Sequence, residues 1–488
     1  MLPFDTLLPI DKTLALPVYQ QVAQAMVQHI RNGVLKPGAM LPGTRELAGI
    51  LNLHRKTVIA AYDELAAQGW IEAVPRKGFN ISSHLPEVKA QRWNTTTYAF
   101  EKKMAAPFYP LVKTGFSFPV LGVPPPRLII DDGHPDSRLA PMDLLVREYR
   151  SRLGSGALRK QVNAILTAGS PRLREVMVSY LAETRGMQTS VSNILITHGA
   201  QMSIYIAASL LLRAGDSVIV GEPGYYVANQ VLESLGARLL HVRVDEQGID
   251  VDAVERLCKG KEIRMLYLIP HHHHPTTVTL SPERRMRLLE IAEKFNFAIV
   301  EDDYDYDFHY SSSPYLPLAA NSHNNRVIYI GSFSKSLSSS IRVGFMVGPE
   351  DFIGQAIYLR RLIDLRGDNN MEDALAALIR NGDVGRHLKK VNRIYEVRRD
   401  RLCHLLDSKL RGVVNYCKPS GGMAVWASFG RKYPLKTVAE KVGKQGVYIS
   451  NGLMYNTHDT AYNSVRIGFA GLTEEEMEEA IGILAGCV

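Results

Sequence analysis

Short apolar runs recur beyond about residue 127 of this 488-residue chain, with stretches of helical periodicity between them. Five of these runs lie at residues 193–197, 216–221, 264–270, 297–303 and 326–332. Continuous runs of Val, Ile and Leu of this length are typical of strands that are buried on both faces. Because helices separate them, the pattern predicts an α/β fold over residues 127–488, in which helices cover both sides of a parallel sheet.

Two other zones precede this large domain. Residues 84–126 show no sustained periodicity and end in three consecutive prolines, which predicts a partly extended linker. Residues 1–83 contain short amphipathic helical patterns and a turn with glycine. The sequence therefore predicts a small N-terminal domain, a linker and a large C-terminal domain.

Charge and composition limit the cellular setting. The chain has 57 Lys and Arg against 49 Asp and Glu, and this net charge of +8 permits a nucleic-acid partner without requiring one. No apolar run approaches the ~18 residues that a membrane span needs. Two aspartates precede the first basic residue, unlike the basic start of a secretory signal. The four cysteines form no CxxC pair, so we expect reduced thiols in a cytoplasmic protein without a membrane partner.

The small domain has the pattern of a DNA-binding helix pair. Residues 17–32 and 55–69 each carry apolar side chains on one helical face, and residues 44–52 predict a shorter helix that Thr44 caps. Residues 69–82 predict two short strands around a basic tip. A helix-turn-helix followed by a hairpin suits insertion of its second helix into the DNA major groove. With only 8 basic against 6 acidic residues here, a small helical domain that binds another protein remains an alternative.

A family resemblance favours DNA. The segment LPGTRELAGILNLHRKTVIAAYDELAAQGWIEAVPRKGF is similar to the winged helix-turn-helix of the GntR family of bacterial regulators. The wing departs from the pattern, because RKGF stands where many members have Gly-Ser-Gly-Thr. The resemblance implies the DNA contacts Arg45, Arg55, Lys56, Thr57, Lys77 and Gly78.

The large domain contains a lysine set among phosphate-binding side chains. The sequence GSFSKSLSSSIRVGF stands at 331–345, at the end of the apolar run 326–332. Ser332 and Ser334 come just before Lys335, and Arg342 lies seven residues after it. Hydroxyl groups and an arginine fork suit a phosphate, and a lysine amine can form a Schiff base with an aldehyde. A Ser-rich surface loop is the alternative for this motif taken alone.

Three more pieces follow other predicted strands. Asp302 could pair with a protonated pyridine nitrogen, and the nearby Tyr304 hydroxyl could bond a ring oxygen. The Gly-Ala-Gln turn at 199–201 opens a helix whose N–H groups can bind phosphate. Tyr225 could stack on a planar ring. All of these pieces are expected at the carboxyl ends of strands, where open α/β sheets bind ligands.

Together these pieces resemble the fold type I aminotransferases, in order over the whole of residues 127–488. The resemblance implies pyridoxal 5'-phosphate (PLP) as cofactor, with Lys335 as Schiff-base lysine, Asp302 on the pyridine nitrogen, Tyr304 on the ring oxygen and Tyr225 stacked. It implies a phosphate site made by Gly199, Ala200, Gln201, Ser332, Ser334 and Arg342. Arg466, in NSVRIGFA, would bind the carboxylate of a substrate or effector. A salt bridge at the end of a strand is the alternative role for Arg466.

One segment departs from the aminotransferase pattern. HHHHPTT stands at 271–277, where these enzymes usually have Asn-Pro-Thr-Gly. Four histidines suggest a metal site, but neighbouring side chains on an extended segment point to opposite faces, so we expect no metal. We expect one or two of the histidines to line the pocket. The change argues against efficient transamination.

The two domains together resemble the MocR subfamily of GntR regulators, as do the stretches GDVGRHLKKVNRIYEVRRDRL at 382–402 and KPSGGMAVW at 418–426. The resemblance implies a head-to-tail homodimer in the bacterial cytoplasm, associated with the nucleoid. It implies a transcription regulator that senses PLP or a PLP-reactive amine, with vitamin B6 synthesis genes as the first expected target. We expect no enzyme beyond a residual PLP-dependent half-reaction. An active aminotransferase with an accessory DNA-binding head is the alternative.

Overall fold

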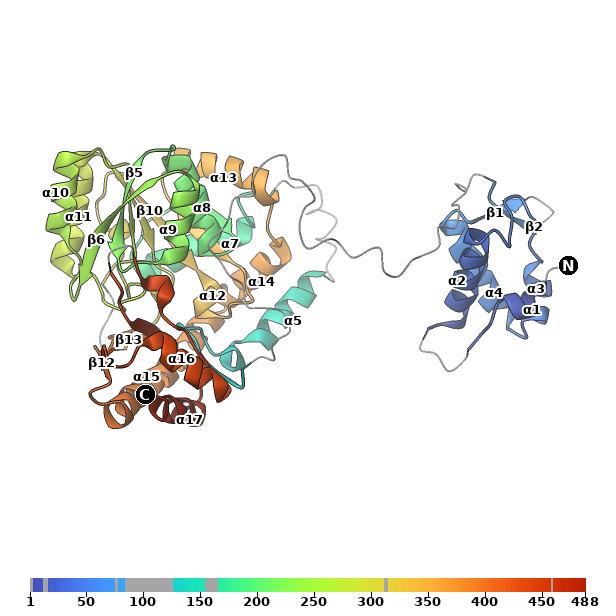
Figure 1. The fold of residues 1–488 in the computed structure, drawn as a ribbon. Coiled ribbons are helices and arrows are strands. Elements are labelled where there is room, and N and C mark those ends of the chain that lie inside the picture. Colours follow the sequence, from blue (N-terminus) through green and yellow to red (C-terminus); the bar gives the residue numbers. More distant parts are fainter. Residues whose placement is uncertain are drawn as a thin grey trace. The chain divides into compact units, whose positions relative to one another are not determined.

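The computed structural model describes residues 3–11, 16–74, 78–83, 126–153, 166–310, 315–457 and 460–488. The chain separates into two compact units, Met1–Pro119 and Val120–Val488, which we call the head and the body (Figure 1). All but the last residue of the expected linker lies outside the described residues. No helix within the described ranges combines the length and apolar character that a membrane crossing requires.

The head is a helical unit closed by a hairpin. Its elements are α1 (Phe4–Leu7), α2 (Val18–Arg31), α3 (Thr44–Ile50), α4 (Arg55–Ala67), β1 (Ile71–Val74) and β2 (Gly78–Ile81), and the two strands pair antiparallel. The apolar faces of α2 and α4 meet in one core, as their periodicity predicted. The Tyr62 hydroxyl, buried in that core, donates to the Pro42 carbonyl at 2.9 Å. The expected helix-turn-helix and hairpin are confirmed.

The expected cap of α3 is wrong by one residue. Gly43, with an extended backbone, is the N-cap, and Thr44 is already helical. The Gly43 N–H donates to the Glu46 carboxylate at 3.3 Å. The side-chain acceptor at this helix start is therefore Glu46, and it accepts the N-cap N–H rather than the first-turn N–H groups that a capping Thr44 would accept.

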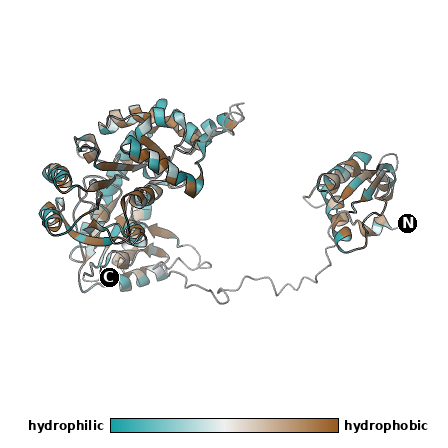
Figure 2. Ribbon diagram, turned by 90° about the horizontal axis from the view of Figure 1, so that it is seen from above, coloured by the Kyte–Doolittle hydropathy of each residue, from teal (hydrophilic) through white to brown (hydrophobic). Residues whose placement is uncertain are grey.

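The body is built around a sheet of eight strands in the order β4-β11-β10-β9-β8-β5-β6-β7. The strands are β4 (Ile194–Thr197), β5 (Ser217–Glu222), β6 (Arg238–Asp245), β7 (Gly248–Ile249), β8 (Met265–Leu268), β9 (Ala298–Asp302), β10 (Val327–Ser332) and β11 (Gly344–Val347). All five apolar runs noted in the sequence form strands. The strands of this central sheet are largely brown, hence hydrophobic, in Figure 2.

The sequence pattern predicts a parallel sheet, but the observed sheet is only partly parallel. The strands from β10 through β9, β8 and β5 to β6 pair in parallel, but β11 runs antiparallel between β10 and β4. Only residues 333–343 separate β10 from β11. That connection is too short for an ordinary crossover helix, so the chain turns back and pairs antiparallel.

Helices cover both faces of the sheet. Alternate residues of β10 show this: Ile328 and Ile330 pack in one cluster with Ile204, whereas Tyr329 packs in another with Leu375. The covering helices are α7 (Pro171–Arg185), α8 (Ala200–Leu211), α9 (Tyr226–Ser234), α10 (Val251–Gly260), α11 (Pro282–Phe295), α13 (Glu350–Asp364) and α14 (Asn369–Arg380). The short helix α12 (Phe333–Ser336) follows β10 directly. The expected α/β architecture is therefore confirmed.

A smaller region packs beside the sheet. Its elements are β3 (Leu128–Ile130), α15 (Asp383–Lys409), β12 (Val414–Tyr416), β13 (Ala424–Phe429), α16 (Leu435–Lys444), β14 (Val447–Ile449), β15 (Ser464–Gly468) and α17 (Glu474–Ala485). Helix α5 (Met142–Leu153) instead packs on α14, in the core against the large sheet. Strand β3 pairs in parallel with β14, and the Gly468 N–H donates to the Asp131 carbonyl at 2.8 Å. These contacts place residues 131–134 beside the end of β15.

A buried ion pair links the end of helix α7 to the short helix α12. The Arg185 guanidinium lies 3.0 Å from the Asp307 carboxylate, and both side chains are at most 10% exposed. Arg185 also donates to the Tyr329 hydroxyl at 3.0 Å, and Asp307 accepts a 2.8 Å hydrogen bond from Ser336. The pair therefore holds α12, and with it Lys335, against the body.

Replacing Asp307 by Asn tests this tie. Because the change leaves the Arg185 charge buried without its carboxylate, we expect a loss of about 3–5 kcal/mol in the free energy of unfolding. Urea unfolding of the full-length protein measures it. The matched control is Glu479→Gln, which removes one partner of the exposed Arg127–Glu479 pair and should leave the free energy of unfolding nearly unchanged, because solvent screens that pair. Equal small losses in both variants would contradict the structural role of the buried pair.

Candidate functional site

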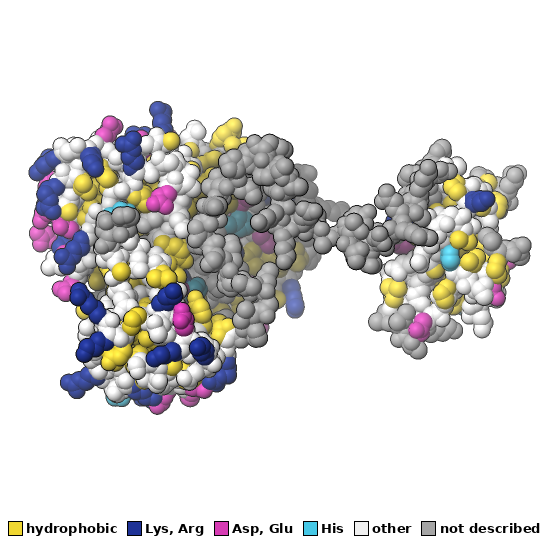
Figure 3. All heavy atoms as spheres, viewed as in Figure 1, with side chains coloured by type: hydrophobic (Ala, Val, Ile, Leu, Met, Phe, Trp, Pro, Cys, Tyr) yellow, Lys and Arg dark blue, Asp and Glu magenta, His cyan; other side chains and the backbone are white. Residues whose placement is uncertain are grey.

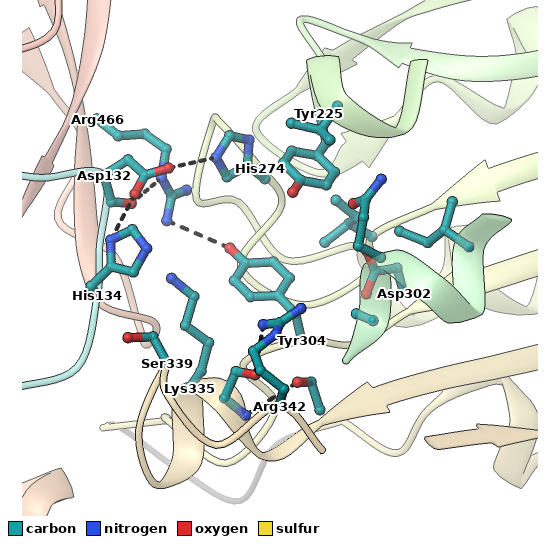
Figure 4. A pocket seen from close by; sticks show the side chains of 17 residues that line it. Asp132, His134, Tyr225, His274, Asp302, Tyr304, Lys335, Ser339, Arg342 and Arg466 are labelled. Atoms are coloured by element: carbon teal, nitrogen blue, oxygen red, sulfur yellow. Dashed lines mark hydrogen bonds and ion pairs between the residues drawn. The ribbon is translucent and has the colours of Figure 1, made fainter. Parts of the chain in front are cut away.

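A cavity of about 300 Å³ opens at the carboxyl ends of β9 and β10. Its lining includes ten of the eleven body residues singled out in the sequence: Ala200, Gln201, Tyr225, Asp302, Tyr304, Ser332, Ser334, Lys335, Arg342 and Arg466. The eleventh, Gly199, is the N-cap of α8 directly beside it. Residues from opposite ends of the body sequence thus meet in one place (Figure 4).

Lys335 projects into this cavity from α12. Its Nζ donates to the Gly133 carbonyl at 2.7 Å. Burial lowers the pKa of the Lys335 amine, and the negative charge of Asp132 opposes that effect. Burial therefore favours the neutral amine, which is the form that attacks a carbonyl carbon.

Asp302 offers an unused acceptor in the same cavity. The Tyr267 hydroxyl donates to its Oδ2 at 2.6 Å, whereas Oδ1 is buried and has no hydrogen-bond partner among the described residues. Burial raises the pKa of Asp302 to about 7. An unpaired buried carboxylate oxygen is costly, and a protonated ring nitrogen would give it a donor. The residues present therefore fit a pyridinium ring.

The start of α8 and Arg342 form a cradle for an anion. Gly199 has φ +86°, and α8 begins at the next residue. Arg342 donates to the His198 carbonyl at 3.0 Å and to the Ser334 hydroxyl at 3.3 Å, which fixes its guanidinium beside the helix start. A Cβ on Gly199 would lie 2.7 Å from Arg342 Nη2. Helix N–H groups beside an arginine suit a phosphate group.

Arg466 reaches the cavity from β15. It is 2% exposed and donates to the carbonyls of Asp132 and Pro275, at 2.8 and 3.2 Å. No side-chain carboxylate lies within ion-pair distance of it in the described part of the chain. The alternative role in a strand-end salt bridge therefore finds no partner there, and the guanidinium can accept an anionic ligand.

The four histidines do not lie on an extended segment, contrary to our expectation. His272 has φ +41°, so the chain turns there, and all four side chains are buried. His271 and His272 lie 2.9 and 3.1 Å from the carboxylates of Asp303 and Asp305. His273 contacts Thr276, and of these four histidines it is His274 that lines the cavity of Lys335. The described residues contain no group of three or more His, Cys, Asp or Glu side chains placed to hold a metal ion.

Sequence reasoning missed several residues of this site. Asp132 and His134 line the cavity from the loop after β3, and Tyr267 from β8 holds Asp302. The acidic run DDGHPD directly after an apolar triplet was a usable signal. Its position, however, depends on the pairing of β3 with β14, which lies more than 300 residues further along the chain.

The residues expected to contact DNA lie at the starts of two head helices. Arg45 belongs to α3, and Arg55, Lys56 and Thr57 form the first turn of α4; all three basic side chains are exposed. Gly78 is exposed at the start of β2. Lys77 lies outside the described residues.

Comparison with known families identifies both units. Residues 149–484 match the family Aminotransferase class I and II, which covers more than half of the chain. The chain belongs to that family. Residues 18–81 match the bacterial regulatory proteins of the GntR family. The combination makes the chain a GntR regulator of the MocR type.

Individual relatives share this architecture. The MocR-type regulator is 27% identical to YisV of Bacillus subtilis, an uncharacterised HTH-type transcriptional regulator, over 95% of this chain and 94% of the relative. It is also 27% identical to the probable rhizopine catabolism regulatory protein MocR of Rhizobium meliloti, over 98% and 95%. Among solved structures, the α-aminoadipate aminotransferase LysN of Thermus thermophilus, complexed with N-(5'-phosphopyridoxyl)-L-leucine, matches with a TM-score of 0.67 and 27% identity, over 74% of this chain and 91% of that one.

Gly199→Ala tests the anion cradle of the MocR-type regulator. The added Cβ would meet Arg342 in a backbone conformation that favours glycine, so we expect weaker binding of PLP and of inorganic phosphate by about tenfold or more. Equilibrium dialysis measures both. Gly354→Ala, whose Cβ would meet nothing within 4 Å, should leave both affinities unchanged. Unaltered phosphate binding in Gly199→Ala would contradict the cradle.

Asp302→Asn tests the unpaired carboxylate through the pH dependence of stability. In the cofactor-free folded protein the pKa is about 7, against an ordinary value near 4. Between these values the folded state holds a proton that the unfolded state has released, so Asp302 lowers the stability progressively as the pH rises. We expect the stability of Asp302→Asn relative to wild type to increase from about pH 4 to about pH 7 and then level off.

The measurement is urea unfolding at a series of pH values. The control is Asp245→Asn, because the hydrogen bond from Arg284 lowers the pKa of Asp245 instead. Its difference from wild type should show no increase over the same range. A constant difference between Asp302→Asn and wild type would mean that Asp302 is ionised throughout.

Proposed function

We propose that this protein is a transcription regulator whose head binds operator DNA and whose body binds PLP and senses a primary amine that reacts with it. The observation that carries the proposal is the cavity: it combines a lysine amine of lowered pKa, an unpaired buried carboxylate oxygen and an anion cradle. These three groups complement the aldehyde, the ring nitrogen and the phosphate of PLP. Bound there, the cofactor supplies an aldehyde that condenses with primary amines.

The residues of the body divide the work of holding this cofactor. Asp302 binds the ring nitrogen, Tyr225 covers the ring, and Tyr304 bonds the ring oxygen. Lys335 binds the aldehyde carbon. The phosphate is held by Gly199, Ala200, Gln201, Ser332, Ser334 and Arg342. Arg466 holds the carboxylate of the effector, a role supported by its burial and by the lack of a carboxylate partner for it among the described residues.

An amine that took the place of Lys335 at the cofactor aldehyde would leave the Lys335 side chain free, and the body would then have a second state. Ser336, the neighbour of Lys335, is bonded to Asp307, which is paired with the buried Arg185. A change at Lys335 therefore reaches helix α7 through two polar contacts, and it shifts the population between two arrangements of the body. The regulator acts in the cytoplasm as a head-to-tail homodimer, in which this shift alters how two heads match two DNA half-sites. Vitamin B6 synthesis genes are the first target to examine.

DNA binding resides in the head. On the face of the body shown in Figure 3, Lys and Arg lie scattered among Asp and Glu rather than in one continuous patch. The exposed Arg45, Arg55 and Lys56, in contrast, stand at the starts of the two helices of a helix-turn-helix. Helix starts that carry basic side chains contact DNA phosphates and base edges.

An active aminotransferase is the second candidate, because Lys335, Asp302 and Arg466 line one cavity. The histidine turn argues against it, since His274 occupies the wall where the enzymes usually carry asparagine. A steady-state assay with an amino donor and a 2-oxo acid separates the two. Turnover near ~10 per second, ordinary for an enzyme, would favour the aminotransferase.

The regulator is tested by binding of the full-length, PLP-loaded protein to a duplex selected from a random library. Arg55→Ala should weaken DNA binding about tenfold or more, because it removes a DNA contact. The slope of the logarithm of the binding constant against the logarithm of the salt concentration should become shallower by about one. Lys36→Ala, which removes an equally exposed charge outside α3 and α4, is the control and should change affinity little. Lys335→Ala should still bind DNA but no longer respond to PLP or amines. Normal DNA affinity of Arg55→Ala, or an unchanged response in Lys335→Ala, would contradict the proposal.

A further inference from the structure

The cavity contains a second carboxylate that no cofactor group explains. Apart from Asp302, Asp132 is the only carboxylate among the described residues that line it. It lies with His134, His274 and Arg466 on one side of the cavity, whereas Asp302 lies on the other (Figure 4). Asp302 serves the ring nitrogen, so Asp132 is left over for another ligand group.

Asp132 has no fixed cation of its own. Its ion-pair partners in the described structure are two imidazoles, His134 at 3.1 Å and His274 at 3.6 Å. Burial lowers the pKa of His274 to about 4, so that this ring is neutral near pH 7. Burial also opposes ionisation of Asp132, but hydrogen bonds from both rings and the charge of Lys335 outweigh it and lower the pKa of Asp132. The carboxylate is therefore negative and lacks a lysine or arginine within ion-pair distance.

The Asp132 side chain is open to the cavity and adjoins the arginine expected to hold a carboxylate. Its side chain is 43% exposed, and the residue lines the cavity. Arg466 Nε donates to the backbone carbonyl of this same residue at 2.8 Å. The Lys335 amine is bonded to the next carbonyl, that of Gly133. A negative and a positive group thus stand side by side at the point where a reacting amine would arrive.

We propose that Asp132 binds a second ammonium group of the effector while Arg466 binds its carboxylate, so that the effector is a diamino acid. The inference rests on the proposed amine-sensing function of the same cavity. A monoamino acid would leave the Asp132 charge without a partner beside Arg466. A diamine without a carboxylate would leave Arg466 unpaired. Only a ligand with two amines and a carboxylate could react at the cofactor aldehyde while it pairs with both Asp132 and Arg466.

The test compares ligands of one length that differ by one charged group. The PLP-loaded full-length protein is titrated by calorimetry with ornithine and with three analogues. Two of them, 5-aminopentanoate and 2-aminopentanoate, lack one amine of ornithine. The third, putrescine, lacks its carboxylate. 2,4-Diaminobutanoate and lysine are measured in the same way, each with its own three analogues, to cover the neighbouring chain lengths. We expect at least one diamino acid to bind about tenfold or more tightly than its three analogues, which is what a hydrogen bond to a charged group is worth.

Asp132→Asn should bring the diamino acid to within about threefold of its monoamino analogues, because it removes only the charge. Asp131→Asn is the matched control: that carboxylate accepts hydrogen bonds from the Gly133 and His134 N–H groups and does not line the cavity, so the preference should persist. Equal affinities in wild type, or a preference that survives in Asp132→Asn, would overturn the inference.

The visible spectrum of the PLP-loaded protein without effector distinguishes a failure of the diamino-acid inference from a failure of the proposed amine-sensing function. A cofactor band near ~420 nm that depends on Lys335 should be present in wild type and Asp131→Asn alike. If the band forms and the preference is missing, the diamino-acid inference is wrong and the amine sensor stands. If no band forms in wild type, both are wrong.

Discussion

The parallel register of β9 and β10 determines where the chemistry of this protein can occur. Asp302 pairs with Ile330, and the N–H of Asp303 donates to the Ile330 carbonyl at 2.9 Å. Side chains alternate along β9, so Asp302 faces the cavity while Asp303 faces the opposite side, where it meets His271 and Tyr329. A slip of one residue would exchange these two carboxylates and remove the acceptor from the cavity. Two adjacent aspartates thus have separate roles, one toward a ligand and one within the body.

Charges that the protein does not neutralise by itself define the site. Elsewhere in the body, Arg185 and Arg398 are buried ions with carboxylate partners, Asp307 and Asp136. Among the described residues, the Asp302 carboxylate keeps an unpaired oxygen, the Arg466 guanidinium meets only neutral oxygens, and the ion-pair partners of the Asp132 carboxylate are imidazoles. Burying charged groups without a charged partner lowers the stability of the protein without ligand. A ligand that pairs with these groups removes that cost and therefore binds tightly. The head has a separate apolar core, so the state of the cavity can change without disturbing the fold of the head.

The sequence was most informative where the signal is local. The strand runs, the helix-turn-helix and the Lys335 motif depend on periodicity or on neighbours within a few residues, and the structure has them as expected. The antiparallel β11, the Gly43 cap and the turn at His272 depend on loop length and backbone dihedral angles that the residue pattern does not specify. Asp132 and His134 depend on a strand pairing across more than 300 residues. The cavity could be predicted from its motifs, but the presence of the Asp132 carboxylate in it is evident only from the three-dimensional structure.

The central claim is that Lys335, in this cavity, holds PLP. The most direct measurement is borohydride reduction of the full-length protein with equimolar PLP, followed by peptide mass spectrometry, because reduction makes a lysine–cofactor linkage permanent. The account predicts one pyridoxyl group per chain, on the peptide that carries Lys335, and its loss when excess phosphate competes for the cradle. Label spread over surface lysines, or none, would show that the cavity does not bind the cofactor.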